Sequence, residues 1–218
     1  MKQFLLVVLF CVGLCAQGSF GTVWTQFNSM DLGTGTVTGT LAGITVTYTS
    51  TDLNWAQINN IGTNWWLCGA SMCPAYIAPG VTPPDTVDMI SINGFNVAHT
   101  ISFSSPVADP VMALISLGQP TVFTTYYFDQ PFTILKDGAG WWGGPGTLQT
   151  VSGNGLQGIE GDGLVQFNGT FSQITWTGAT AEYWNGFNVG TTPEPGTLAL
   201  LGTSMVGVAA MLRRKLMR

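Results

Sequence analysis

Most of the chain shows the two-residue alternation of polar and apolar side chains that is typical of β-strands. Residues 41–49 and 122–128 interleave threonine with aliphatic or aromatic side chains, and this spacing places apolar groups on one face of a strand. Residues 111–117 are almost continuously apolar, which indicates a central buried strand. No stretch of ten residues between the two ends of the chain has helical periodicity.

Turn-forming residues separate these segments and complete the prediction of an all-β domain. Further strands are expected at residues 87–92, 95–97, 100–103, 132–135, 148–151, 164–167, 171–177 and 186–189. Asn93-Gly94 predicts a hairpin between the first two of these. The prolines Pro106 and Pro110 are expected to end the strand at 100–103. The expected fold over residues 19–190 is therefore a β-sandwich of jelly-roll type.

The N-terminus has the three parts of a secretory signal. Lys2 supplies the basic start, residues 4–14 the apolar stretch, and residues 16–18 the small residues of a cleavage site. The apolar stretch is too short to span a membrane as a helix. We expect a signal helix over residues 1–18 with cleavage after residue 18. Cleavage after residue 16, a lipoprotein signal at Cys15 and an ordinary buried helix are the alternatives.

The C-terminus combines a proline-rich motif, an apolar stretch and a basic end. Pro193-Glu194-Pro195 precedes residues 197–212, which are uncharged, apolar and rich in small side chains. A basic cluster follows directly, consisting of Arg213, Arg214 and Lys215. A helix of that apolar length reaches about 24 Å, and the flanking basic side chains can extend to the lipid headgroups. We therefore predict a single transmembrane helix with its basic end in the cytoplasm and the preceding domain outside.

The order of these three C-terminal parts resembles the PEP-CTERM sorting signal of Gram-negative bacteria. The resemblance covers residues 192–218 and implies that the tail is read by exosortase, a membrane protease-transpeptidase. By position, Pro193, Glu194 and Pro195 match the recognition motif, and Arg213 to Lys215 match the stop signal. The family is associated with exopolysaccharide secretion, and the same tail occurs on some proteins labelled ice-binding. A plain single-pass anchor is the alternative interpretation.

The two ends divide the chain into a signal peptide (1–18), an exported domain (19–190) and a sorting tail (191–218). The expected partners are the export machinery, signal peptidase, exosortase and an exopolysaccharide. We expect an inner-membrane intermediate held by the C-terminal helix, followed by release to the cell surface or the extracellular matrix.

The charge of the exported domain argues against nucleic acid as a partner. Between Ser19 and Thr192, ten acidic side chains are accompanied by the single base Lys136. Binding to nucleic acid depends on lysine and arginine side chains that neutralise phosphates. Neutral glycans and divalent cations remain compatible with this composition.

Two cysteines remain after removal of the signal. Cys68 and Cys73 are close in sequence, and export to an oxidising compartment favours a disulfide between them. A zinc site would need four ligands, whereas the chain has one histidine, His99. A catalytic pair of a cysteine with His99 is the remaining alternative.

Adjacent tryptophans indicate a surface that binds sugar rings. Trp65-Trp66 and Trp141-Trp142 both lie in glycine-rich segments. Adjacent side chains on a strand face opposite ways, so one member of each pair can point outward. An exposed tryptophan provides an apolar ring face for stacking. We expect these four residues to include the glycan contacts, with burial in the core as the alternative.

Glu160-Gly161-Asp162 places two carboxylates close together. Retaining glycosidases use a carboxylate pair about 5 Å apart, which makes an exported glycan-active enzyme an alternative function. Calcium is a second alternative, with Glu160 and Asp162 as ligands and Asp129 and Asp137 as further oxygen donors. An ordinary solvated turn is the third.

We predict a non-enzymatic surface or matrix protein that needs no cofactor and binds glycans through its tryptophan-bearing loops. Binding to ice or another solid surface is a further alternative. It requires that the threonines of two Thr-Val-Thr triplets lie on one face, namely Thr36, Thr38, Thr45 and Thr47.

Overall fold

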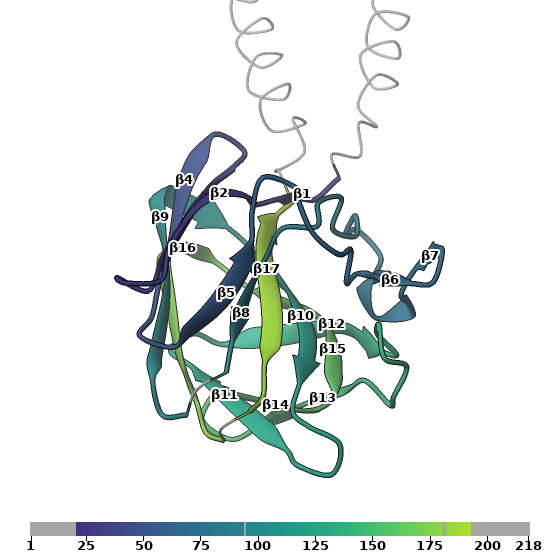
Figure 1. Ribbon diagram of the computed structural model, residues 1–218. Coiled ribbons are helices and arrows are strands. Elements are labelled where there is room, and N and C mark those ends of the chain that lie inside the picture. Colours follow the sequence, from purple (N-terminus) through teal and green to yellow (C-terminus); the bar gives the residue numbers. More distant parts are fainter. Residues whose placement is uncertain (1–20, 94, 181, 193–218) are drawn as a thin grey trace, which may run out of the picture. The chain divides into compact units, whose positions relative to one another are not determined.

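Two large antiparallel sheets contain nearly all the strands that the computed structural model describes (Figure 1). The description covers residues 21–93, 95–180 and 182–192, which belong to one unit, Gly21–Thr192. The first sheet has the strand order β12 (Phe132–Gly138), β15 (Gly161–Phe167), β10 (Val111–Leu117), β17 (Asn185–Thr191), β8 (Met89–Ile92) and β5 (Leu53–Gln57), with β1 (Val23–Trp24) paired to β17.

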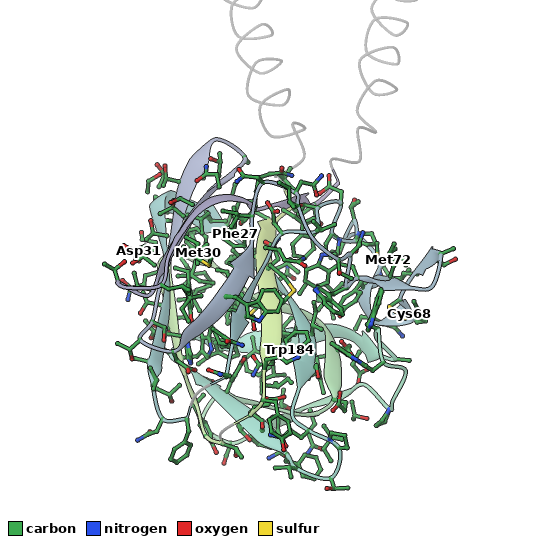
Figure 2. The ribbon with its side chains drawn as sticks, viewed as in Figure 1. Phe27, Met30, Asp31, Cys68, Met72 and Trp184 are labelled. Atoms are coloured by element: carbon green, nitrogen blue, oxygen red, sulfur yellow. A yellow bond between two sulfur atoms is a disulfide. The ribbon has the colours of Figure 1, made fainter. Side chains whose placement is uncertain are left out.

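The second sheet is longer, and a small hairpin accompanies the two sheets. The second sheet has the order β13 (Thr147–Val151), β14 (Gly155–Ile159), β11 (Thr124–Phe128), β16 (Thr170–Gly178), β9 (Ala98–Ala108), β4 (Ile44–Thr49), β3 (Thr36–Leu41) and β2 (Gln26–Asp31). The hairpin consists of β6 (Leu67–Cys68) and β7 (Ser71–Met72) and precedes a short 3-10 helix, η1 (Pro74–Tyr76). In Figure 2 the labelled Cys68 and Met72 mark this hairpin, which projects from the sheets.

A hydrophobic core joins the two large sheets. Tyr48 and Trp176 enter it from the second sheet, and Met112 and Phe187 enter it from the first. Burial of apolar side chains from both sheets in one cluster is the main favourable contribution to folding. The prediction of an all-β protein is therefore confirmed, and the arrangement is β-sandwich-like. The jelly-roll topology stays a prediction.

The opposite face of the first sheet is also covered. Trp66 and Tyr76, from the segment that contains the hairpin and η1, pack in a second cluster with Ile115 of β10. Successive residues of β10 therefore alternate between two apolar clusters, and all seven are buried. This confirms the central buried strand that the continuous apolar run predicts.

Two predictions about strand connections are wrong. The strands on either side of Asn93-Gly94 do not pair with each other, because β8 pairs with β5 and β17, whereas β9 belongs to the second sheet and pairs with β4 and β16. Pro106 does not end the preceding strand, since β9 continues to Ala108. The register between β9 and β16 shifts in this region, and a proline is tolerated where the regular ladder is interrupted.

In the described part of the chain, no helix is both long and apolar enough to cross a membrane. The predicted signal helix at 1–18 and the predicted transmembrane helix at 197–212 lie outside the described residues.

Candidate functional site

A cleft of about 600 Å³ is formed by four segments that are far apart in the sequence. These are the end of β10 with the following loop (116–121), the loop between β12 and β13 (142–145), the β14–β15 connection (159–162) and the residues before β17 (182–184). Glu160, Asp162 and Trp142 thus line one cleft. The tertiary structure adds Glu182 and Trp184 to them.

Aromatic side chains form one wall of the cleft. The rings of Trp142 and Trp184 lie 5.1 Å apart at an interplanar angle of 68°, and Trp184 directly precedes β17 (Figure 2). Trp65 stacks on Trp142 at 5.5 Å and also contacts Trp184. Trp142 keeps 49% of its surface exposed, and Tyr183 keeps 83%. The cleft therefore exposes the ring of Trp142, which is held in place by its contacts with Trp65 and Trp184.

Three carboxyl groups line the same cleft. Asp162 and Glu182 are almost completely buried. Asp162 Oδ1 accepts hydrogen bonds from the Tyr76 hydroxyl at 2.9 Å and from the Ser116 N–H at 3.2 Å. Glu182 Oε2 accepts from the Gly118 N–H and the Asn185 amide, both at 3.0 Å. These bonds hold both buried carboxyls in fixed orientations.

Burial raises the pKa of Asp162 to about 7, against the lowering effect of its hydrogen bonds from Tyr76 and Ser116. Burial also raises the pKa of Glu182 to about 7, although Gly118 and Asn185 donate hydrogen bonds to it. The charge of Glu160 raises both pKa values further. Both buried groups can therefore exchange a proton near neutral pH.

The third carboxylate is held on an unusual backbone conformation. The Ser116 hydroxyl donates to Glu160 Oε2 at 3.0 Å, and both residues have positive φ, 55° for Ser116 and 44° for Glu160. The pairing of β10 with β15 shifts register next to Ser116. A left-handed backbone costs about 1–3 kcal/mol in a residue other than glycine and is found preferentially at functional sites.

The loop between β12 and β13 carries Trp141 and Trp142, and we call it the tryptophan loop. It packs directly on the buried carboxyl group of Asp162. A Cβ atom at Gly140 would come within 2.1 Å of the Asp162 carboxyl carbon. Only glycine permits so close an approach. The same residue contacts the β6–β7 hairpin, because Cys68 Sγ lies 3.0 Å from the Gly140 carbonyl oxygen.

The predicted disulfide between Cys68 and Cys73 is confirmed. Because a disulfide sulfur carries no hydrogen, its approach to the Gly140 carbonyl is a packing contact. The disulfide thus connects the β6–β7 hairpin to the loop that carries Trp141 and Trp142.

The four tryptophans expected to contact glycans have different environments. Trp142 lines the cleft, while Trp141 and Trp65 lie beside it and contact each other at 5.1 Å. The prediction that Trp66 contacts a glycan is wrong. Trp66 is fully buried, packs edge-on against Tyr76 and donates its indole N–H to the Thr86 carbonyl.

Of the four calcium ligands proposed from the sequence, Glu160 and Asp162 share the cleft, whereas Asp129 and Asp137 lie elsewhere. Asp129 Oδ1 accepts a hydrogen bond from the Thr175 N–H, and Asp137 Oδ2 accepts one from the Leu148 N–H. Neither residue lines the cleft. Within residues 21–93, 95–180 and 182–192, no group of three or more His, Cys, Asp or Glu side chains is arranged to hold a metal ion.

The threonines of the two triplets share one face of the second sheet. In the β3–β4 pair, Thr38 lies opposite Thr47 and Thr36 lies opposite Thr49. Thr47 and Thr49 in turn lie opposite Ser102 and Thr100 of β9. The intervening Val37 is buried, so the hydroxyls lie on the outer side. Binding to a solid surface through this face stays a prediction.

A comparison with protein families finds the PEP-CTERM protein-sorting motif at residues 191–215. The chain carries a PEP-CTERM sorting motif. The match confirms the predicted resemblance of the C-terminal tail to the PEP-CTERM signal and supports sorting of an exported protein by exosortase. Nothing among the curated proteins or the solved structures matches the chain. The PEP-CTERM motif therefore accounts for the tail, and the cleft must be interpreted from its own geometry.

Glu182, Tyr183 and Trp184 are the members of the cleft that sequence reasoning missed. An acidic residue followed by two aromatic ones in a loop was the available signal. These residues belong to the cleft because Trp184 contacts Trp142 and Glu182 accepts a hydrogen bond from Gly118. Both partners lie far away in the sequence.

Proposed function

We propose that this exported PEP-CTERM protein is a non-enzymatic surface or matrix protein that binds carbohydrate in the cleft. The observation that carries the proposal is the combination of Trp142, Tyr183 and Trp184 with three carboxyl groups in one cavity. A cavity of about 600 Å³ lies within the usual range for small-ligand sites.

The chemistry of the two kinds of side chain suits a sugar. The CH faces of a pyranose ring are apolar and pack on aromatic rings, whereas its hydroxyls donate hydrogen bonds. Glu160 is partly exposed in the cleft and offers acceptor oxygens. The exopolysaccharide expected from the sorting signal is the natural candidate ligand.

A glycan array with the domain Gly21–Thr192 tests the proposal. We expect Trp142→Ala and Trp184→Ala each to weaken binding of the recognised glycan by about three- to tenfold, since stacking on an aromatic ring is worth about 0.5–1.5 kcal/mol. Phe95→Ala is the matched control, because Phe95 is 58% exposed and does not line the cleft. If all three variants bind the glycan as tightly as the wild type, the proposal is contradicted.

Hydrolysis of the bound glycan is a second candidate, favoured by the raised pKa of Asp162 and Glu182 next to Glu160. Glycosidases combine a carboxylic acid that is protonated at neutral pH with a second, ionised carboxylate. If turnover of the recognised glycan is detected, Glu160→Gln should abolish it. Intact glycan after prolonged incubation with wild-type protein supports binding without catalysis.

A further inference from the structure

We infer that the cleft is selective for a sugar that carries a protonated amino group, such as glucosamine in a polysaccharide without N-acetyl groups. This inference rests on the proposed function, since it names the class of carbohydrate that the cleft takes. It follows from the charge of the cleft, from a carboxyl oxygen of Asp162 that makes no hydrogen bond within the described residues, and from the aromatic wall.

The cleft is acidic and no basic side chain lines it. Glu160, Asp162 and Glu182 all line the cavity. Among the described residues, the basic side chains are Lys136 and His99, and neither belongs to the lining. A neutral sugar would leave these carboxylates without a counter-charge, whereas an ammonium group provides one.

One carboxyl oxygen of Asp162 makes no hydrogen bond within the described residues. Asp162 is 3% exposed, and both of its hydrogen bonds within the protein go to Oδ1. The other oxygen, Oδ2, has no hydrogen-bond partner among the described residues. Oδ2 is not one of the fully buried oxygens that lack a partner, and Asp162 lines the cleft, so this oxygen can accept a hydrogen bond from a molecule bound there. A ligand N–H in the cleft would supply it.

The aromatic wall favours the same ligand. A cation over the face of tryptophan is attracted by the ring quadrupole. Trp142 and Trp184 face the cavity at a steep mutual angle, so that one ring can stack on the sugar while the other contacts its ammonium group.

Binding of an ammonium group should release protons. A nearby positive charge lowers the pKa of a carboxyl, and Asp162 and Glu182 are partly protonated at pH 7 in the free cleft. The other ionisable groups that face them are Glu160, Tyr76 beside Asp162 and Tyr126 beside Glu182. Both tyrosines are buried with raised pKa values and stay neutral, so the carboxyls are the source of the protons.

Calorimetry with short oligosaccharides tests the inference on the domain Gly21–Thr192. The probes are the β-1,4-linked disaccharide of glucosamine, its N,N′-diacetyl form and cellobiose, each at pH 6, where the amino groups are protonated, in two buffers of different ionisation enthalpy. We expect the glucosamine disaccharide to bind about tenfold or more tightly than the other two, with proton release into the buffer.

Charge-neutral variants separate the cleft from the general acidity of the surface. Glu160→Gln and Glu182→Gln should each weaken binding of the amino sugar by about fivefold or more, because glutamine keeps an acceptor oxygen but lacks the charge. Asp85→Asn makes the same charge change at an exposed residue outside the lining and should leave the affinity unchanged. An equal loss in all three variants would overturn the inference.

The outcomes distinguish this inference from the proposed function. Equal affinity for the three disaccharides, or preference for the acetylated or neutral one, overturns the amino-sugar inference and leaves carbohydrate binding intact. Absence of binding to every disaccharide, together with a negative glycan array, overturns both.

Discussion

At the scale of single residues, Asp162 and Glu182 make stability depend on pH in an unusual direction. Both carboxyls have a pKa of about 7 in the folded protein, raised by burial from 3.8 and 4.5. The folded state therefore binds these protons more tightly than the unfolded state, so the two groups lower stability as the pH rises from about 4 through about 7. His99 acts in the opposite sense, because burial lowers its pKa from 6.5 to about 4.

This residue-scale prediction is best measured above the unfolded pKa of histidine. Between pH 6.5 and 8, each carboxyl should lower the free energy of unfolding by roughly 1 kcal/mol. We expect Asp162→Asn and Glu182→Gln each to remove its share of that decline in urea denaturation. Wild-type and variant curves with the same pH dependence would contradict the raised pKa values.

At the scale of elements, the β6–β7 hairpin links the disulfide to the tryptophan loop. Reduction of the Cys68–Cys73 bond should lower the free energy of unfolding by about 2 kcal/mol, the value expected for a small closed loop. It should also weaken glycan binding, since Cys68 packs on Gly140. Denaturation and binding with and without dithiothreitol measure both effects. The double variant Cys68→Ser/Cys73→Ser should not respond to the reductant, and an unchanged wild type would show that the disulfide is dispensable.

The threonine face of β3, β4 and β9 is a second element with its own prediction. Thr38 and Thr47 are opposite each other near its centre. If this face binds ice, the purified domain should inhibit recrystallisation, and Thr47→Lys should remove the effect because a long charged side chain breaks the hydroxyl array. Asp31→Lys at the edge strand β2 is the control. Lack of inhibition by the wild type would end this interpretation.

At the scale of the whole molecule, the sorting tail should decide where the domain ends up. Replacing Pro193, Glu194 and Pro195 by alanine should block recognition by exosortase, and the protein should accumulate unprocessed in the membrane fraction. Cell fractionation with immunoblotting measures both its size and its location. Thr192→Ala, next to the motif, should behave as wild type, whereas normal processing of the triple variant would show that the tail is only an anchor.

Local sequence patterns were sufficient to predict the sorting tail, the all-β class, the buried strand β10 and the disulfide. Each depends on residues that are close in the chain: the Pro-Glu-Pro motif, a two-residue period, an apolar run and two cysteines five positions apart. Local spacing is enough for these because motif recognition, strand periodicity and the closing of a short loop are local properties.

The residues that form the cleft became evident from long-range packing alone. Asn93-Gly94 had the local chemistry of a hairpin, but β8 already had a pairing partner on each side. Trp66 and Trp142 looked alike in sequence, yet one is buried against Tyr76 and the other lines the cavity. Glu182 joins Glu160 and Asp162 through contacts between distant segments. Sheet order and burial arise from such long-range packing, which the local alternation of residues does not encode.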